Sequence, residues 1–176
     1  MTSSIPVTTC SGDLLAAEVT ALVNPVNTVG VMGKGLALQF KNAYPAMFAD
    51  YQRACRSGEL VLGQMHVWDT GESERPRYVI NFPTKGHWRA RSRIEDIEAG
   101  LADLVATVQR LGIDSLAVPA LGAGLGGMEW SEVEPRIRRA FATVRGVRLC
   151  LYLPRTSSRT AVRAGNAAPT PAPTRS

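Results

Sequence analysis

Hydrophobic residues along the chain follow two alternating spacings, and each spacing predicts a different kind of element. Short apolar runs have the length of β-strands, and they lie at residues 5–10, 21–23, 64–68, 78–82, 115–119 and 147–154. Between them, apolar residues recur with the spacing of amphipathic helices. Strands that alternate with helices predict an α/β protein. We therefore expect a three-layer α/β/α sandwich around a central sheet that is mixed and mostly parallel.

Several expected helix ends carry start or stop signals. Pro45 stands where proline favours the first helical turn, and Gly58 stands where glycine ends a helix. Residues 92–95 and 131–134 have the Ser-x-x-Glu spacing of a capping box. We expect the serines of these boxes to cap the two helices that follow.

Two glycine-rich segments come after predicted strands and before predicted helices. The first contains Asn24 and Asn27, whose amides bind hydroxyl groups, and then Gly33, Lys34 and Gly35. Glycine lets the backbone approach a ligand and present its N–H groups, and a helix N-terminus attracts anions. The first segment therefore predicts a site for a phosphorylated ligand of the ribose type.

The second glycine-rich segment repeats this arrangement after another apolar strand. Its centre is Gly122, Ala123, Gly124, Leu125 and Gly126. One such loop is weak support for phosphate binding, whereas two loops at strand ends converge better on a diphosphate. We expect backbone N–H groups of this segment to bind it.

A third unusual segment, residues 81–89, leaves a predicted strand and lies where ligands bind in α/β proteins. It carries Lys85, His87 and Trp88, and arginines follow with no acidic residue before Glu95. Two interpretations are open. The segment is a solvated loop, or it is a cationic, aromatic rim that binds a phosphate or a stacked base.

Asp13 and Tyr152 also have two interpretations each. Asp13 follows the first strand and either accepts a hydrogen bond from a base amine or caps a short helical turn at Leu14. Tyr152 lies near the end of the last strand and either stacks on a base or is an ordinary half-buried tyrosine.

The composition predicts one folded domain and a tail. The 176 residues are 45% hydrophobic and 20% charged, as in most globular domains. The net charge is +5, but residues 155–176 hold four arginines and no acid, which leaves 16 basic and 15 acidic residues elsewhere. Any basic patch must therefore be local. We expect a domain at residues 1–154 and a disordered tail, rich in Pro, Ala, Ser, Thr and Arg, at 155–176.

The remaining composition bears on location and cofactors. No apolar run is long enough to span a membrane, and no signal peptide opens the chain. Cys10, Cys55 and Cys150 are odd in number and far apart, so we expect reduced, mostly buried thiols in a cytoplasmic protein. Acidic residues and histidines do not cluster near the glycine segments, so we expect no metal site. We also expect no cofactor and a monomeric protein.

Taken together, these motifs resemble those of the macrodomain family, whose members bind ADP-ribose. The resemblance covers about residues 5–153 and lies in Gly12-Asp13-Leu14, Asn24-Pro25-Val26-Asn27, Gly33-Lys34-Gly35, Asn81-Phe82-Pro83-Thr84-Lys85 and Gly122-Ala123-Gly124-Leu125-Gly126-Gly127. The motifs are similar to the branch that holds the DNA ADP-ribosyl glycohydrolase antitoxins and the terminal ADP-ribose protein glycohydrolase.

The resemblance implies where each part of ADP-ribose would lie. Asp13 would hold the adenine amine with help from the Leu14 backbone, and Tyr152 would lie near the adenine. Asn27 would lie beside the distal ribose, and Asn24 would support its loop.

The same resemblance implies roles for the glycine segments and for one lysine. Gly33, Lys34 and Gly35 would line the approach of the distal ribose and its phosphate, and residues 122–126 would bind the diphosphate through N–H groups. Lys85 matches the lysine on which hydrolysis depends in this branch, as nucleophile or as acid, and His87 is a second acid–base candidate.

The acceptor is left open between two classes. The protein glycohydrolase of this branch has an aspartate at the position of Gly126, whereas the antitoxins have glycine there, as this chain does. The antitoxins also carry a further C-terminal domain. We expect a hydrolase that removes mono-ADP-ribose, with acidic protein side chains slightly ahead of thymine bases in single-stranded DNA. A non-catalytic ADP-ribose reader and a general nucleic-acid binder are the alternatives.

Overall fold

The computed structural model describes residues 7–154. Residues 1–6 and 155–176, which include the predicted tail and the first residues of the first predicted strand, lie outside the described range. The elements are β1 (Val7–Cys10), the 3-10 helix η1 (Leu14–Ala16), β2 (Ala21–Asn27), α1 (Gly35–Ala43), α2 (Pro45–Ser57), β3 (His66–Asp69), β4 (Tyr78–Lys85), α3 (Ile94–Arg110), β5 (Ser115–Val118), α4 (Trp130–Phe141) and β6 (Arg148–Tyr152).

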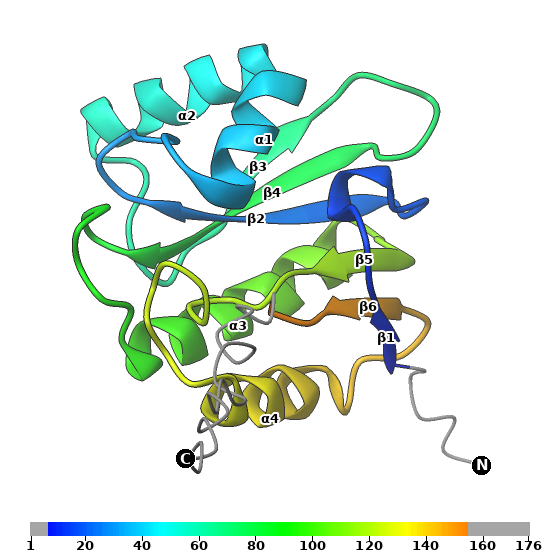
Figure 1. Cartoon of the computed structure of the whole chain (residues 1–176). Helices are drawn as coiled ribbons and strands as arrows, with labels where there is room; N and C mark the ends of the chain where they lie inside the picture. Colours follow the sequence, from blue (N-terminus) through cyan, green and yellow to red (C-terminus); the bar gives the residue numbers. More distant parts are fainter. Residues whose placement is uncertain (1–6, 155–176) are drawn as a thin grey trace, which may run out of the picture.

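The described strands form one six-stranded sheet in the order β1-β6-β5-β2-β4-β3. Neighbouring strands are parallel, except that β3 runs antiparallel to β4. Helices α1 and α2 lie on one side of the sheet, and α3 and α4 lie on the other (Figure 1). This confirms the predicted three-layer sandwich with a mixed, mostly parallel sheet.

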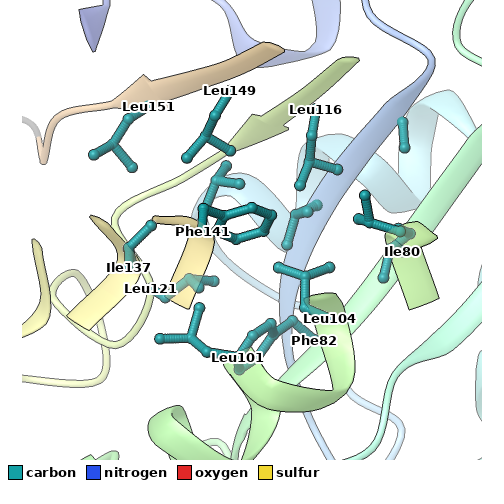
Figure 2. Packing of buried hydrophobic residues seen from close by; sticks show 14 of the residues in the cluster. Ile80, Phe82, Leu101, Leu104, Leu116, Leu121, Ile137, Phe141, Leu149 and Leu151 are labelled. Atoms are coloured by element: carbon teal, nitrogen blue, oxygen red, sulfur yellow. The ribbon is translucent and has the colours of Figure 1, made fainter. Parts of the chain in front are cut away.

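Two hydrophobic cores hold the helices against the sheet, and strand β2 contributes to both. Ala21 and Val23 belong to the core under α3 and α4, whereas Leu22 and Val26 belong to the core under α1 and α2. Successive side chains of a strand point to opposite faces, so Ala21, Leu22 and Val23, which are covered on both sides, are all apolar. Figure 2 shows the first core, where Phe82 lies beside the buried residues of α3.

The strand order brings three distant loops to one edge of the sheet. Strands β5, β2 and β4 are neighbours, and β2 is parallel to both of the others. Their carboxyl ends therefore meet at one edge, where residues 28–34, 86–93 and 119–129 leave the sheet. The hydroxyl of Thr28 donates to the carbonyl of Gly86 at 2.9 Å, which ties the first loop to the second. Ligands of open α/β sheets bind at this edge.

Strands β2 and β4 extend further than the sequence predicts. Asn24 pairs with Asn81 and Asn27 with Lys85 in the parallel register, so the two asparagines are strand residues rather than loop residues. The backbone ladder does not depend on apolar side chains, so the hydrophobic pattern underestimated the strand length.

Both predicted capping boxes are wrong. The N-cap of α3 is Arg93 and that of α4 is Glu129, and neither makes a side-chain hydrogen bond to its helix. The Ser92 N–H donates to the carbonyl of Gly126 at 3.0 Å, so a contact between loops holds Ser92 outside the helix. Pro45 at the start of α2 and Gly58 at its end are confirmed.

The expectation of three reduced thiols is also wrong for two of them. Cys10 and Cys150 form a disulfide between β1 and β6, with their Cα atoms 5.8 Å apart. The two residues are 140 positions apart in sequence, and only the pairing of the first strand with the last brings them together. Cys55 is the one free cysteine among the described residues, and it is half-buried.

Candidate functional site

The loop after β2 is held by the side chain of Asn27. Its Oδ1 accepts hydrogen bonds from the N–H groups of Val29 and Val31, and its Nδ2 donates to the carbonyl of Val31 at 2.7 Å. The Tyr51 hydroxyl lies 2.9 Å from the same Oδ1. Burial raises the pKa of Tyr51, so this hydroxyl stays a neutral donor. Asn27 thus shapes the first glycine loop through its own amide.

Asn24 lies three residues before Asn27 in β2 and is completely buried. Its Nδ2 donates to Oδ1 of Asn81 at 3.0 Å, and Asn81 Nδ2 lies 3.0 Å from Nδ1 of His66. The other ring nitrogen of His66 lies 2.9 Å from Asp50. Asn24 therefore supports the site from within the sheet. His66, the first residue of β3, thereby links β4 to α2.

Lys85 at the end of β4 and two residues of the loop that follows it hold three consecutive carbonyls of the second glycine loop. Lys85 Nζ donates to Leu125 O at 3.3 Å, the Ser92 N–H donates to Gly126 O at 3.0 Å, and Arg91 donates to Gly127 O at 2.7 Å. These contacts fix the orientation of the peptide planes in the loop.

The amide groups of the same loop are left for a ligand. The Leu125 carbonyl, which Lys85 contacts, and the Gly126 N–H belong to the same peptide group. In a trans peptide these two groups point in opposite directions, so the Gly126 N–H points away from Lys85. The N–H groups of Gly122, Gly124, Leu125 and Gly126 make no hydrogen bond within the described part of the chain. Several free N–H groups in one loop are suited to bind a phosphate.

Gly126 is packed so closely that no side chain fits. A Cβ atom placed there would lie 2.4 Å from Ser92 Oγ and 2.5 Å from the carbonyl oxygen of Gly122. The Ser92 hydroxyl is itself buried and has no hydrogen-bond partner among the described residues. The glycine at this position therefore lets the loop approach Ser92.

The two glycine loops also face each other. Gly35 has a left-handed φ of 57°, and a Cβ atom on it would lie 3.6 Å from Leu125. Gly33 and Lys34 precede it and are exposed. The start of α1 thus lies against the second loop, as expected if both bind parts of one ligand.

Lys85 lies where these loops meet. Its amine donates to the carbonyl of Trp88 at 3.0 Å as well as to Leu125, and burial lowers its pKa from the ordinary lysine value. A lysine nitrogen has four tetrahedral positions. The side chain takes one and the two carbonyls take two, so one position is left for a lone pair or a proton.

His87 and Trp88 lie on the exposed rim of the site. Their rings stack with centroids 5.2 Å apart, and the guanidinium of Arg89 lies 4.4 Å from the Trp88 ring centre. The His87 Nδ1 accepts from the Arg89 N–H. Among the described residues His87 makes no hydrogen bond to Lys85, so the structure places Lys85 against the glycine loop and His87 on the rim.

Asp13 and Tyr152 mark the opposite end of the same edge. The Asp13 carboxylate accepts the Leu15 N–H at 3.0 Å and so caps η1. Burial and, to a smaller extent, the charge of Asp13 raise the pKa of Tyr152. Tyr152 pairs with Cys10, three residues before Asp13, in the register of β1 and β6. An open pocket of about 460 Å³ lies at this end of the edge, and its lining includes Cys10, Gly12 and Tyr152.

The site residues therefore follow the sheet edge in strand order. Asp13 and Tyr152 lie at β1 and β6, the second glycine loop at β5, the first at β2, and Lys85 at β4. Strands lie about 4.8 Å apart, so the four spacings from β1 to β4 span about 19 Å. The fold and site define a class of α/β protein whose carboxyl sheet edge carries an elongated row of loops with free N–H groups, an arrangement suited to an elongated, phosphate-containing ligand.

Sequence reasoning assigned Ser92 to a helix cap and gave Tyr51 no role in the site. Their roles depend on contacts across many residues, such as that of Ser92 with Gly126. The only local signal was the unbroken polar and basic character of residues 85–93.

The described residues contain neither a cluster of metal ligands nor a helix that could span a membrane. No three side chains of His, Cys, Asp or Glu within residues 7–154 gather as metal ligands would.

No helix in that range combines the length and the apolar character that crossing a membrane requires.

Comparison with known families agrees with this geometry. The family model of the Macro domain matches residues 23–137, so the chain belongs to the macrodomain family. A Mycobacterium tuberculosis protein named DNA ADP-ribosyl glycohydrolase is 53% identical over 149 residues, which are 85% of this chain and 42% of that protein. A Thermus aquaticus protein of the same name is 52% identical over 81% of this chain and 40% of its own length.

Solved structures show the same likeness. The macrodomain of Mycobacterium tuberculosis DarG superposes with a TM-score of 0.84 at 52% identity and covers 86% of this chain and 99% of its own. Thermosipho africanus DarTG in complex with ADP-ribose gives a TM-score of 0.78 at 39% identity, over 86% of this chain and 43% of its own. This chain spans less than half the length of the curated relatives named above.

Proposed function

We propose that this chain binds ADP-ribose along the carboxyl edge of its sheet and hydrolyses the bond that joins ADP-ribose to a DNA base. The Lys85 amine carries this proposal, because a domain that only binds ADP-ribose does not need a half-buried amine between two loops. The relatives named DNA ADP-ribosyl glycohydrolase support the DNA acceptor. Their names reverse the order expected from the sequence, in which acidic protein side chains came slightly first.

The binding mode follows the arrangement of the edge. The adenine lies between Asp13 and Tyr152, the diphosphate lies on the free N–H groups of the second glycine loop, and the distal ribose lies beside Asn27 and Lys85. The ADP-ribose in the Thermosipho africanus complex supports this ligand. Every loop of the site comes from one chain, so we expect the monomer to be active.

Hydrolysis breaks the bond between the anomeric carbon of the distal ribose and the base nitrogen. The departing base takes a proton, and water supplies the hydroxyl group of free ADP-ribose. If the fourth position of the Lys85 nitrogen holds a lone pair, the amine attacks the anomeric carbon first and water then releases it. If it holds a proton, that proton passes to the leaving base while water attacks.

A release assay with two substrates tests the proposal. One substrate is a single-stranded oligonucleotide that carries ADP-ribose on thymidine, and the other is a protein that carries it on glutamate. Wild type should release ADP-ribose from the oligonucleotide. Lys85→Ala should abolish release while ADP-ribose affinity stays within about tenfold. Lys41→Ala, at the far end of α1, is the matched control because it removes the same charge away from the site.

The other outcomes exclude the proposal in different ways. Release from the modified protein alone would contradict the DNA acceptor and restore the acidic side chain. Release from neither substrate, with ADP-ribose still bound, would make the chain a reader. Release by Lys85→Ala at the wild-type rate would show that another group performs the chemistry.

A further inference from the structure

We propose that the exposed side chains around Lys85 bind the single strand on either side of the modified nucleotide, with Trp88 stacking on a neighbouring base. We call this surface the acceptor rim and define it as Val29, Val31, Trp88, Arg89, Arg91 and Leu125. The proposal deepens the function proposed above and rests on it for the identity of the acceptor.

Exposed apolar side chains are concentrated in the acceptor rim. Seven large hydrophobic residues of the described chain are exposed, and four of them are Leu125 at 68%, Val29 at 46%, Trp88 at 44% and Val31 at 40%. These four lie in the three loops that surround Lys85. Exposed apolar residues that gather in this way indicate a binding surface rather than chance.

Contacts between the loops show that the rim is continuous. The amine of Lys85 touches the carbonyls of both Trp88 and Leu125, and Thr28, next to Val29, donates to Gly86. Leu125 in turn lies over the start of α1 at Gly35. The rim therefore surrounds the lysine, and a strand bound to it would present its modified base there.

The charge of these loops suits a polyanion. Residues 28–34, 85–93 and 119–129 contain five basic residues and one acidic residue, Glu129 at the end of the third loop, although the chain outside residues 155–176 is almost balanced at 16 basic and 15 acidic. The Arg93 guanidinium is partly compensated by Glu95 at 3.8 Å. The other exposed arginines of this segment are Arg89, which lies over the Trp88 ring, and Arg91, which contacts the carbonyl of Gly127. Arginine side chains next to a bound strand contact its phosphates.

The stack of His87, Trp88 and Arg89 distinguishes nucleic acid from an acidic protein surface. Arginines alone would suit either partner. Planar side chains that remain exposed while stacked on one another suit nucleobases, because base–aromatic stacking is available to any single strand and guanidinium groups add to it. We therefore assign the rim to single-stranded nucleic acid.

A binding measurement tests the rim without any chemistry. Fluorescence anisotropy would follow a labelled, unmodified oligodeoxythymidine as the protein is added. Trp88→Ala should weaken binding about tenfold or more, as expected for the loss of one stacked base. It removes the ring but keeps the carbonyl that Lys85 contacts, so ADP-ribose affinity should not change. Leu62→Ala, another exposed apolar residue, is the matched control and should bind the oligonucleotide as wild type does.

The salt dependence provides a second readout. Arg89→Gln should lower the slope of log affinity against log salt concentration by about 0.7, which corresponds to one phosphate contact on a single strand. Equal slopes for Arg89→Gln and wild type would show that Arg89 makes no phosphate contact with the bound strand. Equal affinities of Trp88→Ala and wild type would overturn the proposal, as would an acidic peptide that binds more tightly than the oligonucleotide.

A kinetic comparison separates this proposal from the proposed function. Wild type should act with a lower KM on a modified oligonucleotide than on modified thymidine alone, and Trp88→Ala should reduce that preference. If wild type releases ADP-ribose from neither, the proposed function fails, while the anisotropy result still decides the rim. If release from DNA occurs and Trp88→Ala keeps the full preference, the proposed function stands and the rim is wrong.

Discussion

Gly126 offers a sharp test of how the second glycine loop is built. The residue does not need a left-handed backbone, so any cost of a side chain there comes from space alone. A Cβ atom would lie 2.4 Å from Ser92 Oγ, 2.5 Å from Gly122 O and 2.9 Å from Gly122 Cα. Replacement of Gly126 by alanine or aspartate must therefore displace Ser92 and the loop.

The two close neighbours differ in how easily they move. The Ser92 hydroxyl can rotate, because it holds no hydrogen bond. The Gly122 carbonyl cannot move without breaking its hydrogen bond from the Met128 N–H at 2.9 Å. Overpacking of this kind costs about 1–3 kcal/mol. In a domain of this size, each kcal/mol lowers the midpoint of thermal unfolding by about 2–4 °C.

Ligand binding should suffer as well as stability. The displaced loop carries the free N–H groups of Gly124, Leu125 and Gly126, so their positions change with it. We expect Gly126→Ala to weaken ADP-ribose binding about tenfold, which corresponds to about 1.4 kcal/mol. Gly126→Asp should weaken it further, because its carboxylate would repel the diphosphate. Gly126→Asp should therefore not give this chain the activity of the protein glycohydrolase that has an aspartate at this position.

Thermal unfolding and calorimetric titration with ADP-ribose measure the two effects. Gly124→Ala is the matched control for stability, because a Cβ atom there meets nothing within 4 Å. It should change the free energy of unfolding by less than about 0.5 kcal/mol. Adding Ser92→Ala to Gly126→Ala should recover the part of the lost stability that comes from the clash with Ser92 Oγ. The part that comes from the clash with the Gly122 carbonyl should remain. Wild-type stability and affinity in Gly126→Ala would refute this account of the loop.

Two further predictions concern the core and the lysine. Gly100→Ala in α3 would place a Cβ atom 2.4 Å from the ring of Phe82, so it should lower the free energy of unfolding by about 1–3 kcal/mol, although alanine favours helices. Phe82→Leu should cost less in that background than in wild type, and strictly additive costs would contradict the contact. NMR titration of Lys85, with its signal identified by Lys85→Ala, should give a midpoint below the ordinary lysine value, because burial lowers its pKa. The release rate should change over that same pH range. It should rise with increasing pH if the neutral amine attacks, and fall with increasing pH if the ammonium donates its proton. A titration midpoint at the ordinary lysine value would contradict the lowered pKa of this amine.

The sequence predicted the parts of this protein that depend on local pattern. The alternation of strand and helix spacing gave the three-layer sandwich, and both glycine loops lie at strand ends as expected. Local pattern placed Lys85 in a polar and basic segment at a strand end, and the resemblance to macrodomains singled it out within that segment. Such signals survive folding because they concern neighbours along the chain.

Other features failed to follow from local pattern because tertiary contacts competed with it. Ser92 has the spacing of a helix cap, but its N–H binds Gly126 instead. Cys10 had no visible partner, because Cys150 reaches it only through the pairing of β1 with β6. No local pattern showed that the Asn27 amide also holds the loop after β2, where it contacts Val29, Val31 and the Tyr51 hydroxyl.

The sequence by itself thus determined the fold class and the two glycine loops at strand ends, and its resemblance to macrodomains singled out the lysine. Only the tertiary structure decided how these parts act together. The strand order β5-β2-β4 sets three loops side by side, and the contacts of Lys85, Arg91 and Ser92 then fix three consecutive carbonyls of one loop. Strand order depends on pairing between segments far apart in the chain, and no local spacing of residues encodes that pairing.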